Sequence, residues 1–265
     1  MNRAPFLLIL LSACGASTST GTWDGDAGVV IGEGGTIDPT TLDKFSFFVT
    51  SQEALLQLSG SANGFGGDLR YGETGDGAGL RGADKLCATI AERSMTGAGQ
   101  KRWRAFLSAS NVNAIDRLNA GPWYDRLGRV VANSKSELLA DRPTAADSAI
   151  KKDLPNENGE PNSSPNGVAV DNHDTLTGSN AQGTLYSASA TCADWTSTTA
   201  SGKPRIGHAF PRSGATSGDN ANWISSHDAP GCGAGINTSA TSMGQGTTVG
   251  GGGGYGAFYC FAEVP

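Results

Sequence analysis

The sequence predicts an α+β domain with a mostly antiparallel sheet, two helices and long loops. Glycine accounts for 39 of the 265 residues and only 17% of residues are charged, which favours a loop-rich chain over a helical bundle. Apolar residues recur at helical spacing between positions 80 and 91. Near its end the chain carries Phe258, Tyr259 and Phe261, residues that favour strands. A helix near the start and a core strand at the end therefore frame the predicted domain.

The amino terminus predicts export. Arg3 precedes an apolar run over 6–11, which is shorter than the roughly 20 residues that a membrane-spanning helix needs and is typical of a secretory signal. The run ends in LSAC, which resembles a bacterial lipobox, so we expect residues 1–13 to be removed and Cys14 to be acylated. Two or more acyl chains anchor a protein stably in a membrane. Since Gly15 follows, the expected location is the cell envelope, at the outer membrane of a Gram-negative cell.

Residues 14–42 are predicted to form a flexible tether between the lipid anchor and the folded domain, residues 43–265. The tether is rich in Ser, Thr, Gly and Asp and has little apolar surface to bury. Residues 29–31, Val-Val-Ile, offer the alternative of a short edge strand.

The charge balance limits the partners. A formal net charge of −6 argues against nucleic acid, heparin-like polymers and anionic lipid as main ligands. The densest positive segment is KRWR at 101–104, whose charges we expect on the solvent face of a strand.

The expected elements follow in chain order. A strand covers 44–51, a Gly/Asp loop 66–82, a helix 81–95 and a second strand 103–108. The remaining expectations are a helical turn at 113–118, a turn into a strand at 121–125, a capping box formed by Ser134 and Glu137, a long loop at 141–183, and short strands near Tyr186, Ile206, Trp223 and Tyr255. The tryptophans Trp103, Trp123, Trp195 and Trp223 are interpreted as core or loop anchors rather than as a sugar platform.

Four cysteines remain beyond Cys14, namely Cys87, Cys192, Cys232 and Cys260. An even number in an exported chain predicts disulfides, although three pairings are compatible with the sequence. No CxxC spacing is present, which argues against a zinc knuckle.

Several motifs occur in a distinctive order from about Phe45 to Glu263: GLRGADKLCATIAE, WRAFLSAS, SELL, CADWTS and YGAFYCFAE. In this order they resemble the endostatin domain of collagens XV and XVIII, a variant of the C-type lectin-like fold, and a set of bacterial exported proteins without assigned function. The resemblance implies two nested disulfides, Cys87–Cys260 and Cys192–Cys232. The zinc site of endostatin uses N-terminal histidines, and no histidine precedes His173 here, so that site does not carry over. Nor does its basic heparin-binding surface, given the acidic balance.

Two groups of oxygen ligands are candidates for calcium, the only cofactor that the sequence suggests. The first is the EPN tripeptide with Glu160 and Asn162, which resembles part of the calcium and sugar site of C-type lectins; the downstream Trp-Asn-Asp of that pattern is missing, since Trp223 is followed by Ile-Ser. The second is a loop cluster comprising Asp68, Glu73, Asp76 and Asp84, for which a solvated turn is the alternative.

The histidines suggest no active site. The segment DNHD at 171–174 is interpreted as a polar turn with an exposed histidine, although His173 offers a metal ligand. Neither a GxSxG elbow nor an HExxH helix accompanies the three histidines, so no enzyme is predicted.

We therefore expect a lipid-anchored binding or adhesion module that recognises an extracellular protein or glycan. A purely structural envelope lipoprotein, calcium-dependent carbohydrate binding and a secreted hydrolase are the alternatives.

Overall fold

The computed structural model describes residues 37–211, 214–239 and 246–265. The expected signal peptide, Cys14 and the segment 29–31 lie outside these residues. The α-helices of the described part are α1 (Gln52–Ser59), α2 (Ala78–Ser94), α3 (Lys135–Leu138) and α4 (Cys192–Trp195). The strands are β1 (Phe47–Val49), β2 (Trp103–Ala105), β3 (Trp123–Tyr124), β4 (Val130–Ala132), β5 (Asp174–Leu176), β6 (Arg205–His208), β7 (His227–Asp228) and β8 (Gly254–Ala262).

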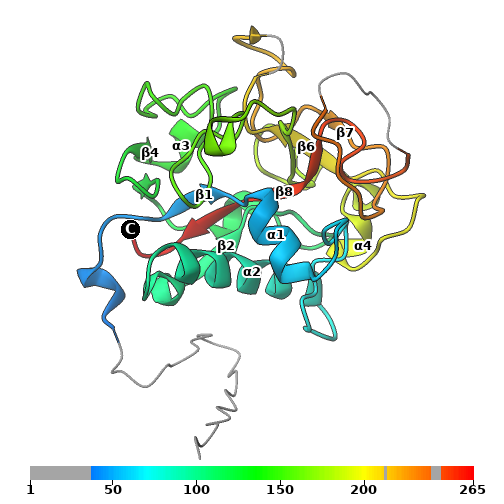
Figure 1. Ribbon diagram of the computed structural model, residues 1–265, viewed down its shortest axis with the longest axis horizontal. Helices are drawn as coiled ribbons and strands as arrows, with labels where there is room; N and C mark the ends of the chain where they lie inside the picture. Colours follow the sequence, from blue (N-terminus) through cyan, green and yellow to red (C-terminus); the bar gives the residue numbers. More distant parts are fainter. Residues whose placement is uncertain (1–36, 212–213, 240–245) are drawn as a thin grey trace, which may run out of the picture.

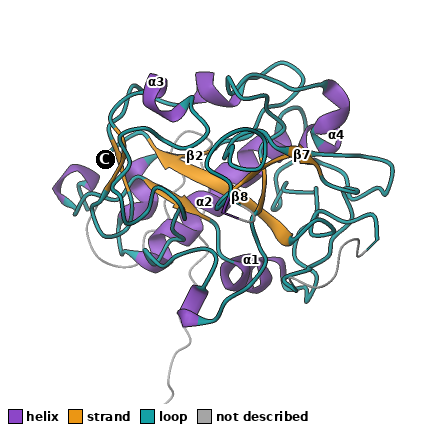
Figure 2. Cartoon of the chain, turned by 90° about the horizontal axis from the view of Figure 1, so that it is seen from above, coloured by secondary structure: helices purple, strands orange, loops and turns teal. Residues whose placement is uncertain are grey.

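The C-terminal strand β8 is the centre of the fold. It pairs antiparallel with both β1 and β2 near its end, and parallel with β5 nearer its start. Beyond β5 the sheet continues through β6 to β7, while β3 and β4 form a separate pair. All nine residues of β8 are buried. Figure 1 shows β8 passing through the middle of the molecule, and Figure 2 shows that loops surround the strands on most sides. The α+β class and the mixed sheet are thus as predicted.

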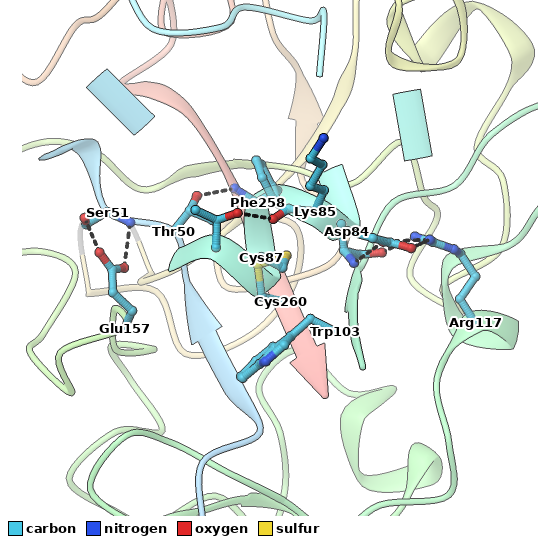
Figure 3. The surroundings of a disulfide bond; sticks show 12 residues. Thr50, Ser51, Asp84, Lys85, Cys87, Trp103, Arg117, Glu157, Phe258 and Cys260 are labelled. Atoms are coloured by element: carbon cyan, nitrogen blue, oxygen red, sulfur yellow. Dashed lines mark hydrogen bonds and ion pairs between the residues drawn. A yellow bond between two sulfur atoms is a disulfide. The ribbon is translucent and has the colours of Figure 1, made fainter. Parts of the chain in front are cut away.

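Helix α2 covers the sheet with the apolar face that its sequence spacing predicts. Leu86, Cys87 and Ile90 are buried, and Cys87 forms a disulfide with Cys260 of β8 (Figure 3). This bridge spans 173 positions and holds the last strand against the first long helix. The four tryptophans that we interpreted as anchors are all buried.

The second disulfide, Cys192–Cys232, is also the one that the resemblance implies. Its first cysteine is the first residue of α4. This short element is a left-handed turn, because φ is positive at Cys192, Ala193, Asp194 and Trp195. A left-handed conformation costs an L-residue about 1–2 kcal/mol. The Nε1 of Trp195 donates to the carbonyl of Ser108, which fixes the turn against the core.

Several expectations were wrong in detail. The described residues contain four α-helices, not two, and α1 was not predicted. The long loop expected at 141–183 contains β5, and no strand forms at Tyr186 or Trp223.

Two local predictions also fail. The hydroxyl of Ser134 does not cap α3, and Glu137 accepts from the backbone N–H of Asn133, one residue before the one that a capping box requires. Lys101, expected on a solvent face, is buried and donates to two backbone carbonyls.

Candidate metal centre

One group of ligand-type side chains stands out at the edge of the sheet. His173, Asp174, His208 and His227 each direct one ligand atom to a common point, and these four atoms lie within 4.8 Å of one another. The cluster uses all three histidines of the chain. His173, Asp174 and His208 are buried, whereas the side chain of His227 is 43% exposed.

The strand register explains why these residues meet. Asp174 on β5 is directly opposite His208 on β6, so the two side chains share one face of the sheet. His227 on β7 is opposite Ile206, and side chains two positions apart on β6 project from the same face. His173 precedes β5 and is therefore not bound by the strict alternation of the strand.

Each imidazole is oriented through its Nδ1. The Nδ1 of His208 lies 3.0 Å from the carbonyl of Asn220, and that of His227 lies 3.2 Å from the carbonyl of Asp228. The Nδ1 of His173 lies 2.6 Å from Oδ1 of Asp171. A carbonyl or carboxylate oxygen can only accept, so each Nδ1 carries a proton, and Nε2 is the atom whose lone pair a neutral ring would present to the cluster. Metal-ligating histidines are held in this way.

The cluster leaves buried polar atoms without hydrogen-bond partners. Seven buried side-chain polar atoms of the described residues have none, and four of them belong here: Nε2 of His173, Nε2 of His208, and both carboxylate oxygens of Asp174. Buried polar groups are ordinarily paired, and an unpaired acceptor costs about 1–3 kcal/mol. A bound cation would satisfy both Nε2 atoms and one of the carboxylate oxygens at once.

The distances between the carboxylate and the three rings suit a tetrahedral ion. Oδ1 of Asp174 lies 3.1, 3.7 and 3.4 Å from the Nε2 atoms of His173, His208 and His227. In a tetrahedral site with metal–ligand bonds of about 2.0–2.1 Å, two donor atoms lie about 3.3 Å apart. The three values scatter around that distance. Imidazole donors favour zinc and other first-row transition metals, whereas calcium takes six to eight oxygens.

The pKa values of His208 and His227 are shifted in opposite directions. Burial lowers the pKa of His208 to about 4, so its ring is neutral at physiological pH. Burial also disfavours the charged form of His227, but its contacts with Asp174 outweigh this and raise the pKa.

The glycine run before β8 forms one wall of the site. A Cβ at Gly252 would lie 2.3 Å from Oδ2 of Asp174, and a Cβ at Gly253 would lie 2.8 Å from Cε1 of His173. Gly253 also has φ +128°, which glycine alone adopts readily. The backbone therefore approaches the ligands to a distance that any other residue would prevent.

The calcium candidates do not assemble into a comparable cluster. Asp68 pairs with Arg70, and Asp84 pairs with Arg117. Asn162 is buried and both of its polar side-chain atoms are bonded within the protein. The group around His173 is the one set of three or more His, Cys, Asp or Glu ligands found within the described residues, so neither Asp76 nor Glu160 belongs to such a set.

Sequence reasoning missed this site because its ligands come from three separate segments without a motif spacing. The interpretation of His173 as exposed was wrong, since the residue is fully buried. The available signal was the adjacent pair His173 and Asp174, two residue types that ligate metals. Nothing in the sequence placed this pair beside His208 and His227.

Comparisons with known proteins give no independent assignment. No protein-family model matches the chain, and no curated protein matches it.

Proposed function

We propose that this protein is an exported domain that binds one zinc ion through His173, Asp174, His208 and His227. The observation that carries the proposal is the convergence of three Nε2 atoms on a buried carboxylate for which the described residues offer no donor apart from these imidazoles. The donor set is neutral imidazole plus one carboxylate, which suits a borderline ion such as Zn²⁺.

The metal role that we propose is structural. Four protein donors complete a tetrahedral shell, whereas catalytic zinc sites keep one position for water or substrate. The ligands belong to β6, to β7 and to residues 173–174 at the start of β5, and these are neighbouring strands of only two to four residues. A metal here stabilises the end of the sheet that lies three strands beyond β8, the strand that carries the Cys87–Cys260 bridge.

The broader setting remains the one inferred from the sequence. We propose a C-type lectin-like, endostatin-like domain that is anchored at Cys14 and acts as a binding or adhesion module in the cell envelope. The nested disulfides and the central C-terminal strand support that fold, and the lipobox supports the anchor. No helix of the described residues is long and apolar enough to span a membrane. Replacing Cys14 with Ser should release the chain from membranes, and a variant that still sediments with them would contradict the anchor.

Metal content and cobalt spectroscopy test the zinc proposal. The purified protein should contain one zinc per chain by elemental analysis. Cobalt substituted for zinc should give the intense visible bands of a tetrahedral site rather than the weak bands of an octahedral one.

Asp174→Asn should abolish the cobalt bands, because it removes the charge and keeps the size of the side chain. Asp76→Asn is the matched control, since it removes an exposed carboxylate outside the cluster. Zinc bound equally by both variants, or none bound by the wild type, would reject the site.

A further inference from the structure

The metal centre has a support outside its ligand segments, in the chain that follows α3. Arg142 is buried there, and its guanidinium donates to three backbone carbonyls. Nη1 lies 2.6 Å from the carbonyl oxygen of His208, and Nη2 lies 2.7 Å from that of Ala209. Nε lies 2.8 Å from the carbonyl oxygen of Lys151. The planar fork therefore spans two consecutive carbonyls at the end of β6, one of which belongs to a proposed ligand.

The segment that Arg142 holds is also the one on which two other ligands are aligned. The backbone N–H of Ala209 donates to the carbonyl of His173 at 2.8 Å, and Asp174 is directly opposite His208 in the β5–β6 pair. A buried guanidinium is costly unless its donors are bonded. Two of the three bonds of this one fix the backbone of the site.

The residue before this arginine, Asp141, holds the loop that orients the ring of His208. Its Oδ2 accepts from the backbone N–H of Gly218 at 2.8 Å, and its Oδ1 accepts from Nδ2 of Asn222 at 3.1 Å. Within the loop, the carbonyl of Asn220 accepts from Nδ1 of His208. The carbonyl of Asn222 accepts from the backbone N–H of the same histidine. The carboxylate of Asp141 therefore fixes the segment that supplies both acceptors.

The loop is attached to the chain around α3 at two further points. The backbone N–H of Trp223 donates to the carbonyl of Asp141 at 3.1 Å, and its Nε1 donates to the carbonyl of Leu138 at 2.8 Å. Trp223 is fully buried, so this attachment is part of the core. Residues 138–142 and 218–223 thus form one hydrogen-bonded support for the end of β6.

These contacts leave His208 with one polar atom for the cluster. Its backbone N–H, its carbonyl and its Nδ1 are bonded to Asn222, Arg142 and Asn220, whereas Nε2 has no hydrogen-bond partner among the described residues. That atom lies 3.7 Å from Oδ1 of Asp174. A flip of the ring would break the bond to Asn220 and turn Nε2 away from the carboxylate.

We infer that Asp141 and Arg142 are positioning residues of the metal centre: Arg142 holds the backbone of His208, and Asp141 holds the loop that accepts from its Nδ1. This role rests on the zinc site proposed above. Both residues act through the histidine and not on the ion. Removal of either should therefore lower the affinity for zinc and leave the ligand set, with its tetrahedral cobalt bands, in place.

Competition titration of the purified protein against a chelator of known affinity measures the effect. Arg142→Met should weaken zinc binding by about 10–100-fold, the range typical of lost outer-shell support. Arg142→Lys should recover only part of the loss, because an ammonium lacks the fork that reaches two carbonyls. Arg117→Met is the matched control, since the side chain of Arg117 is only 11% exposed and donates to the carbonyl of Ala105. Its zinc affinity should equal that of the wild type.

Asp141→Ala gives a second test that leaves the buried guanidinium in place. Zinc affinity should fall in this variant as well. In the metal-free protein, nuclear magnetic resonance of the imidazole nitrogens should show His208 as one tautomer with the proton on Nδ1, and Asp141→Ala should give a mixture of tautomers. Asp194→Ala is its control, because Asp194 also accepts from a backbone N–H, that of Ser110, but its partners belong to none of the ligand segments.

Three outcomes would overturn the inference. Wild-type zinc affinity in both Arg142→Met and Asp141→Ala would remove the positioning role and leave the zinc site itself intact. An equal loss of affinity in Arg117→Met and Asp194→Ala would show that general destabilisation weakens binding. A wild type that binds no zinc would reject this role together with the proposed function. Should Arg142→Met not fold, the affinity and the His208 tautomer of Asp141→Ala decide.

Discussion

Asp174 lies directly opposite His208 in the antiparallel β5–β6 pair, and its Oδ1 is 3.7 Å from Nε2 of that histidine. The backbone ladder fixes this spacing. Within the described parts of the chain, this buried carboxylate has no donor other than the imidazoles around it, so the sheet holds an acceptor that a cation would satisfy. The predictions for the metal centre follow from this relationship.

Zinc should stabilise the folded protein. Because the ligands converge only in the folded state, free zinc at 100 times its Kd should raise the free energy of unfolding by about 2.7 kcal/mol. Thermal unfolding with added zinc and with a chelator measures this increment. Asp174→Asn should abolish it; an increment that persists in this variant would place the zinc elsewhere.

Asp171 should act as a positioning residue for His173. Its Oδ1 lies 2.6 Å from Nδ1 of the histidine and fixes the ring with Nε2 toward the cluster. Loss of such a partner typically weakens metal binding by about 10–100-fold. Competition titration of Asp171→Asn against a chelator of known affinity measures the change, and the tetrahedral cobalt bands should be retained. Unchanged affinity would show that the ring is held by packing alone.

Gly253 should be required for metal affinity as well as for stability. A Cβ at this position would lie 2.8 Å from Cε1 of His173 and 3.2 Å from Oδ1 of Asp171. Gly253→Ala should therefore displace the ligand and weaken zinc binding. Gly72→Ala is the matched control, because Gly72 also has a positive φ but has nothing within 4 Å of the added Cβ. Both variants carry backbone strain, so equal zinc affinities in the two would refute the steric role of Gly253.

The two disulfides should contribute different amounts to the free energy of unfolding. They close loops of 173 and 40 positions, for which the chain-entropy relation gives about 5 and about 4 kcal/mol as upper values. Removal of Cys192–Cys232 also lets the left-handed turn at 192–195 relax, which offsets part of the loss. In urea unfolding, the Cys87→Ala/Cys260→Ala variant should thus be less stable than the Cys192→Ala/Cys232→Ala variant. The reverse order would show that the turn is not strained.

The elements predicted from the sequence are those with a strong local pattern. Helix α2 shows a helical period over many residues, and β8 is a run of strand formers around Cys260. Helix α1 escaped prediction because it is eight residues long and only Ala54 and Leu55 are buried. A short helix with so few core contacts carries little periodic signal.

The metal centre could not be predicted because it depends on register. One histidine precedes β5, one ends β6 and one begins β7, and their approach follows from pairing between strands of two to four residues. Strand pairing over such short segments is not encoded in a local pattern. Nothing in the glycine run 250–254 indicates that its backbone lies against two of the ligands.

Because of Lys101, the free energy of unfolding should vary with pH in the alkaline range. Its Nζ is buried and donates to the carbonyls of Asp43 and Pro265, and burial lowers its pKa from 10.5 to about 8 although Asp43 acts in the opposite direction. Between these two values the unfolded chain keeps a proton that the folded protein has lost. The free energy of unfolding therefore rises with pH across this window, and the contribution is lost as pH falls through about 8.

Urea unfolding between pH 7 and pH 10, roughly the window in which a shifted lysine titrates, tests this dependence. Lys101→Met keeps most of the side-chain volume and should remove the rise, whereas Lys152→Met, at an exposed position, should retain it. The methionine variant also loses two hydrogen bonds, so the comparison uses the slope with pH rather than the absolute stability. A slope equal to that of the wild type in Lys101→Met would mean that the buried ammonium is fully compensated by its carbonyl partners.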